Sequence, residues 1–234
     1  MMKITTLNNQ EAEVGNIDVP QLTALGVGPT VQRLFVNSFI TDHAGRLIFK
    51  FYWDGELKDK EIFGFHTCKL GCSIGIWTSG DQQHPKDIFL FFSAVEAIAY
   101  AHLNELKFHF LNNCLFVALG VRPSKYQIDI LKNKFGKVRY HTVFGNDILG
   151  KIYDCKVSLW LSNKDCSFLL NEESVQVTEI SLAENLKSVA IDRHKFSYFS
   201  FCRLFGKRPN LKAHKPSKKE YGSFLGYLAQ KNQY

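Results

Sequence analysis

The chain has 234 residues, of which 45% are hydrophobic and 22% are charged, and its formal net charge is +7. This balance excludes a disordered chain, and no apolar run approaches membrane-spanning length, so we expect a globular protein without a membrane partner. The charge is unevenly distributed. Seven of the 29 basic residues lie between Arg203 and Lys219, where there is no Asp or Glu, which leaves 22 basic and 22 acidic residues elsewhere.

Residues 1–86 predict a small α+β subdomain. Short helices are expected from Pro20 and from Pro29, because proline is favoured in the first turn of a helix, with a stop at Gly26–Gly28 between them. An antiparallel meander follows, and Asp54-Gly55 is a strong hairpin signal within it. Its expected strands are Leu47–Trp53, Ile62–His66 and Ile74–Trp77.

The next stretch, Ile88 to Tyr100, reads IFLFFSAVEAIAY and predicts a strand that turns directly into a helix. Its five leading apolar residues are typical of a strand that is buried on both faces of a parallel sheet. Ser93 is a natural N-cap, and helix formers with apolar residues at helical spacing follow it. The stretch is therefore expected to form the first half of a βαβ unit.

Strands and helices alternate from there to residue 180, which predicts a parallel sheet flanked by helices, an α/β fold. The expected strands are Ile88–Phe92, Cys114–Leu119, Val138–Phe144 and Val175–Ile180. The expected helices cover 94–106, the stretch from Pro123-Ser124 to Gly136, about Ile148–Leu161 and about Leu182–Val189.

Acidic residues follow two of these strands. Glu96 lies in the first turn of the helix after the first strand, and Asp147 lies at the junction after the third. Because the carboxyl ends of parallel strands meet at one edge, these carboxylates, with help from Asp154, form a candidate catalytic and Mg²⁺ site. The alternative is structural, because acids are favoured in the first turn of any helix.

At this point the chain resembles the Toprim (topoisomerase–primase) domain, and more closely the Toprim-like primase and mobilization proteins of bacterial mobile elements. The resemblance is carried by the strand–helix unit at 88–101, by the strand that ends in Leu119-Gly120, and above all by GNDILGK, Gly145–Lys151. It is best over about residues 88–180. It implies a parallel Toprim-like domain at 87–190, with the smaller subdomain before it.

The resemblance also implies an acidic site that is incomplete here. In active members a Glu ends the first strand and an Asp-x-Asp pair ends the third, and these acids bind Mg²⁺ for phosphoryl transfer. The family's Glu falls at Phe92 or Ser93, and the first Asp falls at Gly145. A further acidic position falls on Glu96, the second Asp on Asp147, and the family's glycine on Gly150. The loss of two carboxylates predicts a degenerate domain, with no cofactor, or with Mg²⁺ if the site is intact.

The basic segment predicts a contact with DNA. Pro209 and Pro216 favour an extended chain in this C-terminal extension, 191–234, and a short apolar end follows. The cations expected to contact phosphates are Lys207, Arg208, Lys212, Lys215, Lys218 and Lys219. The alternative is a solvated tail that keeps the protein soluble.

Three functions remain open from the sequence. The first is a nucleic-acid-associated, catalytically silent protein that acts in replication or mobilization of a mobile element, with DNA and replication or mobilization proteins as partners. The second is an active Mg²⁺-dependent primase or nuclease, and the third is a scaffold that binds only proteins. The N-terminus has no apolar targeting segment, so we expect a cytoplasmic location.

Overall fold

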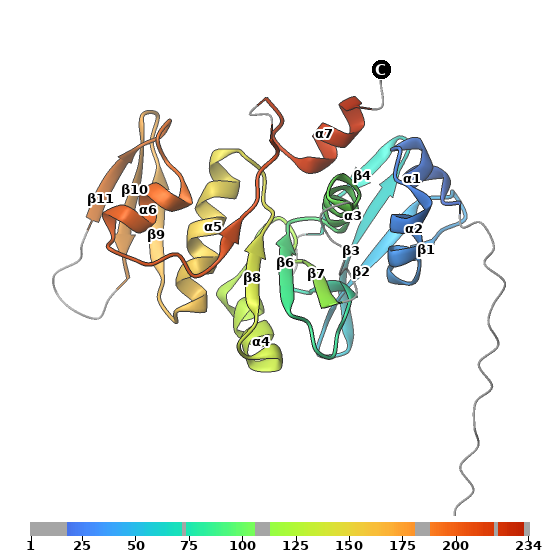
Figure 1. Cartoon of the computed structure of the whole chain (residues 1–234), viewed down its shortest axis with the longest axis horizontal. Coiled ribbons are helices and arrows are strands. Elements are labelled where there is room, and N and C mark those ends of the chain that lie inside the picture. The colour runs from blue at the N-terminus through green and yellow to red at the C-terminus, as the bar shows by residue number, and fades with distance from the viewer. Residues whose placement is uncertain (1–17, 72–73, 106–112, 181–187, 218–219, 232–234) are drawn as a thin grey trace, which may run out of the picture.

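The computed structural model describes residues 18–71, 74–105, 113–180, 188–217 and 220–231. They form a mixed α/β fold with three sheets side by side: an antiparallel sheet near the N-terminus, a mostly parallel central sheet, and a small antiparallel sheet at the other end (Figure 1). The predicted α/β class is therefore confirmed.

The central sheet has five strands in the order β12-β8-β6-β7-β5. Its strands are β5 (Trp77–Gly80), β6 (Asp87–Phe91), β7 (Cys114–Ala118), β8 (Arg139–Thr142) and β12 (Lys212–Ala213). Strand β6 pairs in parallel with β7 and with β8, as the alternation of strands and helices predicts. Strand β5, at one edge, is antiparallel to β7, and β12, at the other edge, is parallel to β8.

Helices follow these parallel strands. Helix α3 (Ala94–Leu103) connects β6 to β7, and α4 (Lys125–Phe135) connects β7 to β8, whereas α5 (Ile148–Leu161) leads from β8 out of the central sheet. Ser93 caps α3, and Ser124 forms a capping box with Gln127 at the start of α4, so both helices begin where the sequence predicts.

The fourth predicted strand of the parallel sheet is wrong. Val175–Ile180 largely corresponds to β10 (Ser174–Glu179), which lies between β9 (Cys166–Leu170) and β11 (Ser188–Asp192) in the separate antiparallel sheet. The turn after β9 is tight, and the Asn171 amide donates to the Ser174 carbonyl at 2.9 Å. A strand that follows another strand after so short a turn pairs with it as a hairpin, because a parallel crossover needs a dozen or more residues.

The helix predicted at about Leu182–Val189 is also wrong at its end. Residues 181–187 lie outside the described part of the chain, and Ser188 and Val189 begin β11. This strand pairs antiparallel to β10 over its whole length.

The N-terminal helices begin where the sequence predicts them, but the strand expected at Ile62–His66 begins earlier, at Glu56, and ends at Gly64. Helices α1 (Pro20–Ala24) and α2 (Pro29–Phe35) begin at the two prolines and are followed by a single 3-10 turn, η1 (Val36–Ser38). The antiparallel sheet has the order β1-β2-β3-β4. Its strands are β1 (Ile40–Thr41), β2 (Leu47–Trp53), β3 (Glu56–Gly64) and β4 (Thr67–Lys69).

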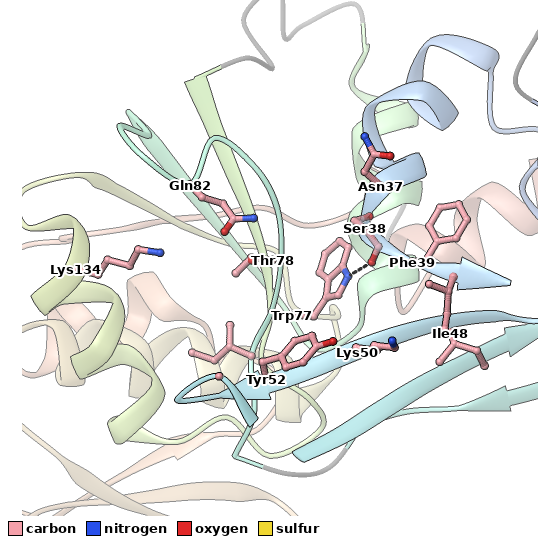
Figure 2. A pocket seen from close by; sticks show the side chains of 13 residues that line it. Asn37, Ser38, Phe39, Ile48, Lys50, Tyr52, Trp77, Thr78, Gln82 and Lys134 are labelled. Carbon is pink, nitrogen blue, oxygen red and sulfur yellow. Dashed lines mark hydrogen bonds between the residues drawn. The ribbon is translucent and has the colours of Figure 1, made fainter. Parts of the chain in front are cut away.

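This sheet has one face in the core and one toward a groove. Asp54 and Gly55 both have positive φ and make the predicted hairpin turn between β2 and β3. The strand predicted at Ile74–Trp77 is wrong, because only Trp77 is in a strand, and that strand, β5, belongs to the central sheet. Figure 2 shows the groove between β2, β5 and α4.

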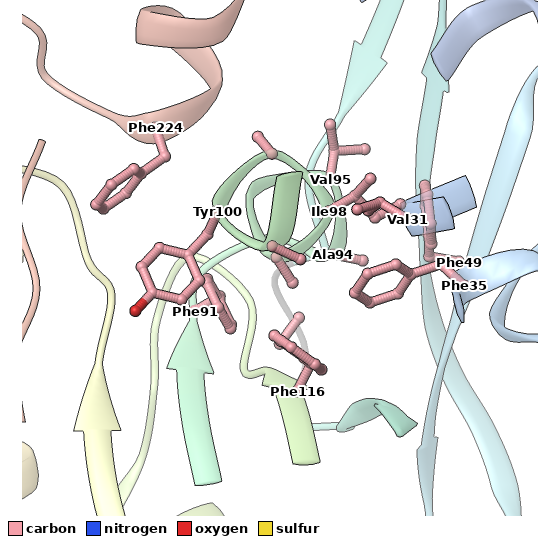
Figure 3. Packing of buried hydrophobic residues seen from close by; sticks show 14 of the residues in the cluster. Val31, Phe35, Phe49, Phe91, Ala94, Val95, Ile98, Tyr100, Phe116 and Phe224 are labelled. Atoms are coloured by element: carbon pink, nitrogen blue, oxygen red, sulfur yellow. The ribbon is translucent and has the colours of Figure 1, made fainter. Parts of the chain in front are cut away.

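Helix α3 is the centre of the largest core cluster. It is buried on nearly all sides, because the N-terminal sheet and α2 cover one side, the central sheet covers another, and α7 (Phe224–Lys231) covers a third. Figure 3 shows Val95 and Ile98 pointing toward Val31 of α2, whereas Tyr100 points the other way, toward Phe224. The Tyr100 and Phe224 rings meet edge to face at 4.9 Å between centroids. Helix α3 therefore joins the N-terminal and C-terminal parts of the chain.

The C-terminal segment is bound to the central sheet. After α6 (Tyr198–Leu204), it adds the short edge strand β12. His214 then bridges two elements: its Nε2 lies 2.9 Å from Nδ1 of His141 on β8, and its Nδ1 lies 3.0 Å from the hydroxyl of Tyr100 on α3. Asp87 extends this chain of hydrogen bonds, with Oδ1 2.8 Å from Nε2 of His141. The chain around His214 is thus held in place by partly buried polar contacts as well as by a strand.

Candidate functional site at the carboxyl edge of the central sheet

A cavity of about 460 Å³ lies where β6 and β8 end. Glu96 and Asp147 both line it, so two of the three predicted site carboxylates share this cavity, whereas Asp154 is not among its lining residues. The other lining residues are Cys68, Leu70, Phe92, Ser93, Val95, Val143, Gly145, Gly222, Ser223, Leu225 and Gly226.

The Glu96 carboxylate binds the N-terminus of α7. Its Oε2 accepts a hydrogen bond from the Leu225 amide at 3.2 Å. Burial raises the pKa of Glu96, and hydrogen bonds from the Ser223 side chain and from the Leu225 and Phe224 amides act in the opposite direction. The carboxylate thus supplies an acceptor that the first turn of α7 lacks. Its role in the structure is to fix α7 on α3.

Asp147 is the N-cap of α5. Its Oδ1 accepts a hydrogen bond from the Gly150 amide at 2.6 Å. Gly150 packs so tightly that an added Cβ would lie 2.0 Å from the Gly145 carbonyl oxygen, so the turn requires glycine. The GNDILGK motif is therefore explained locally as a tight turn followed by a capped helix.

Asp154 is the most buried of the three predicted carboxylates, with a side chain that is 1% exposed. Its Oδ2 lies 2.8 Å from Nζ of Lys215, and the same ammonium donates to the carbonyls of Phe144 at 3.1 Å and Gly145 at 2.9 Å. Burial raises the pKa of Asp154 to about 6, against the opposing effect of Lys215. Lys215 was predicted as a nucleic-acid contact, but its ammonium is paired with Asp154 inside the fold.

A fourth carboxylate at this edge comes from a residue that the sequence analysis missed. Glu61 of β3 is 1% exposed and lies at the start of α3. It accepts hydrogen bonds from the Ser93 hydroxyl at 2.7 Å and from the amides of Ala94 at 2.8 Å and Val95 at 3.2 Å. Burial raises its pKa, and the nearby charge of Glu96 adds to that effect. The available signal was an acid two residues before Phe63, on the face of β3 that lies opposite Phe49 and Leu47.

These carboxylates do not make a metal centre. Within the described ranges, no three His, Cys, Asp or Glu side chains gather closely enough to hold a metal ion. Glu61, Glu96 and Asp147 accept backbone N–H groups, and Asp154 faces an ammonium. A divalent cation would have to displace these partners, so the residues present do not fit the Mg²⁺ that the family resemblance implies.

The predicted basic contacts divide into three groups. Arg208 and Lys212 are exposed, as is neighbouring Arg203. Lys207 is partly buried, 3.8 Å from Glu179 and over the rings of Phe201 and Phe205, and Lys215 is the partner of Asp154. Lys218 and Lys219 lie outside the described residues.

Comparison with known proteins adds little. No family model matches the chain, and no curated protein matches it in sequence. One similar solved structure is a chain from the bacteriophage T7 complex of lagging-strand DNA polymerase with primase domains of two gp4 subunits, bound to an RNA/DNA hybrid and dTTP. It is 14% identical with a TM-score of 0.35, and the similarity covers 79% of this chain and 84% of that chain.

The helices of the described ranges are all too short or too polar to cross a lipid bilayer.

Proposed function

We propose that this protein binds nucleic acid as a non-catalytic, Toprim-like protein, and that it acts in the replication or mobilization of a mobile element. The observation that supports the binding is the acid-free basic segment, in which Arg203, Arg208 and Lys212 are exposed and Lys212 belongs to the edge strand β12. Cations held on a rigid edge can neutralise phosphates and release counterions without first ordering a flexible tail.

The absence of catalysis is supported by the carboxyl edge. Two carboxylates of the family pattern are replaced, and Glu96, Asp147 and Asp154 each serve a helix start or an internal ion pair. A two-metal phosphoryl transfer needs carboxylate oxygens that are free to coordinate. The Toprim-like assignment itself rests on the sequence resemblance and on the parallel arrangement of β8, β6 and β7.

Binding to labelled DNA, measured by fluorescence anisotropy over a salt series, tests this proposal. We expect wild-type affinity to fall steeply with salt and to be indifferent to Mg²⁺. The triple variant Arg203→Gln, Arg208→Gln, Lys212→Gln should bind more weakly, and its logarithmic salt slope should fall by about 0.7 for each lost single-strand phosphate contact or about 0.9 for each duplex contact. Lys164→Gln, which removes an exposed lysine from the turn after α5, is the matched control.

Two results would contradict the proposal. An unchanged salt slope in the triple variant would show that the β12 edge does not contact phosphates. Binding or turnover that requires Mg²⁺ and disappears in Asp147→Asn would instead show an active metal-dependent enzyme. Under our proposal, Asp147→Asn leaves DNA affinity nearly unchanged.

A further inference from the structure

The groove of Figure 2 has a volume of about 620 Å³ and lies along β5, the edge of the central sheet opposite β12. Lys50 on β2 and Lys134 on α4 lie on opposite sides of it, with Tyr52 and Thr78 between them. Among the residues that the structure describes, no Asp or Glu lines this groove. It is therefore a basic pocket, separate from the carboxyl edge. Its lining residues are Asn37, Ser38, Phe39, Ile40, Ile48, Lys50, Tyr52, Gly55, Ile76, Trp77, Thr78, Gln82 and Lys134.

Polar side chains in the groove are left without internal partners. Within the described ranges, the side chains of Asn37, Lys50, Thr78 and Gln82 make no hydrogen bond or ion pair. Trp77 differs, because its indole N–H donates to the Ser38 carbonyl at 2.7 Å and so fixes the wall of the groove. Donors and acceptors that converge on one concavity are what a polar ligand requires.

Charge is segregated between the two faces of the N-terminal sheet. Lys50 pairs directly with Lys60, and Lys69 pairs with Ile62, two residues further along β3, so the three lysines lie on one face across three strands. The acidic residues of β3 lie on the other face: Glu56, Asp59 and Glu61 pair with Trp53, Phe51 and Phe49. Like charges directly opposite each other destabilise a sheet, and a bound polyanion would relieve that repulsion.

An aromatic platform lies beside these cations. Tyr52 is on the same face as Lys50, two residues further along β2, and is 45% exposed. A second cavity of about 190 Å³ extends the groove over an apolar floor of Leu115, Ile130, Leu131 and Phe135, with Asp54 as its one acidic lining residue among those described. The residues that it shares with the groove are Tyr52, Ile76, Thr78, Gln82 and Lys134. An exposed ring above an apolar recess fits a flat heterocycle, and the side-chain amide of Gln82 can form hydrogen bonds with the edge of that heterocycle.

We infer that this groove binds single-stranded nucleic acid, with a base stacked on Tyr52 and the backbone phosphates along Lys134, Lys50 and Lys60. A single strand fits better than a duplex, because only an unpaired base can reach the ring and recess. It fits better than a free nucleotide, because the lysines continue beyond the groove onto the sheet, to Lys60 and Lys69. The inference rests on the proposed function only for the class of ligand, nucleic acid. The groove and the basic β12 edge are separate surfaces, because β5 and β12 are opposite edges of the central sheet.

The test uses the full chain and a fluorescein-labelled oligothymidylate of about a dozen nucleotides. We expect Tyr52→Ala to weaken single-strand binding about 5- to 150-fold, the effect of losing one base–aromatic stack. Tyr52→Phe should retain wild-type affinity, because the ring remains. Lys50→Gln should reduce the logarithmic salt slope by about 0.7. Phe199→Ala removes an even more exposed ring from α6, far from the groove in the sequence, and should have no effect.

The outcomes separate this site from the β12 edge. Loss of single-strand binding in Tyr52→Ala, with the β12 triple variant unchanged, supports the groove and contradicts the β12 edge as the nucleic-acid surface of the proposed function. The reverse pattern overturns the groove and leaves the proposed function standing. Equal affinity for the oligothymidylate and its duplex, or full competition by the mononucleotide at equal nucleotide concentration, also overturns the inference. Thermal unfolding of each variant shows that a loss of binding is not a loss of folding.

Discussion

The carboxyl edge of the central sheet and the groove beside β5 differ in whether their polar side chains have partners inside the protein. At the carboxyl edge, Glu61 and Asp154 are buried and Glu96 is partly buried, and each carboxylate has a hydrogen-bond or ion-pair partner inside the fold. In the groove, Lys50, Thr78 and Gln82 face the cavity with no partner among the described residues. A buried polar group is satisfied because leaving it unpaired is costly, whereas a group held for a ligand must remain available. The difference points to structure at the first region and to binding at the second.

If the carboxyl edge is structural, breaking its ion pair should have the largest effect on stability. Lys215→Met leaves the Asp154 carboxylate buried without its cation, and we expect the free energy of unfolding at neutral pH to fall by about 3 kcal/mol. Denaturant unfolding measures this loss. Lys212→Met, three residues away on exposed β12, is the control and should change stability by less than about 0.5 kcal/mol.

The pH dependence of that loss sharpens the test. The pKa of Asp154 is raised from 3.8 to about 6 in the fold. Between these two pH values the native carboxyl therefore holds a proton that the unfolded chain has already released. This contribution to stability is present in acid and is lost as the pH rises through about 6. Lys215→Met should therefore cost less near pH 5, where Asp154 is neutral, than near pH 8. A loss that is independent of pH would mean that Lys215 stabilises the fold through its other contacts.

Glu61→Gln should have the next largest effect. The amide keeps one oxygen but directs an N–H₂ group at the start of α3, where the Ser93 hydroxyl and the Ala94 and Val95 amides need acceptors. We expect about 2 kcal/mol of destabilisation by chemical unfolding. Asp59→Asn, two residues earlier on the same strand and partly exposed, is the matched control. Equal stabilities for the two variants would remove the structural role from Glu61.

Glu96→Gln is expected to have a smaller effect, of about 1 kcal/mol, because α7 loses a charged acceptor at its N-terminus and keeps a neutral one. Amide hydrogen exchange should localise the change to α7. DNA affinity with and without Mg²⁺ should stay at the wild-type value. A variant of normal stability that lost a Mg²⁺-dependent activity would place Glu96 in a metal site and so reverse the comparison.

Local sequence signals predicted the individual elements better than their partners. Pro20, Pro29, Ser93 and Ser124 fix helix starts through backbone geometry and capping, and Asp54-Gly55 fixes a turn, so each of these could be located from a few residues. The partner of a strand depends on residues far away. The strand Cys166–Leu170 was not predicted, and without it β10 was assigned to the wrong sheet.

The candidate site shows the same limit. The sequence placed Glu96 and Asp147 at one edge, and they share a cavity there, but it contained no sign that α7 would use Glu96 as its cap. Glu61 comes from a different sheet, and Lys215 from a segment that was interpreted as a solvated tail or a DNA contact. Such long-range pairings depend on tertiary packing, which periodicity and capping patterns do not encode.

The smallest effects on stability are expected in the groove, and they complete the comparison. Gln82→Ala and Thr78→Ala remove side chains that have no internal partner, so each should change the free energy of unfolding by less than about 0.5 kcal/mol. Single-strand affinity should nevertheless fall severalfold in both variants, because a lost hydrogen bond contributes about 1 kcal/mol. Gln83→Ala, next to Gln82 but outside the groove lining, controls for changes in the loop. A groove variant that destabilises the protein as much as Glu61→Gln would mean that these polar groups, too, serve the fold, and a ligand would no longer be needed to explain them.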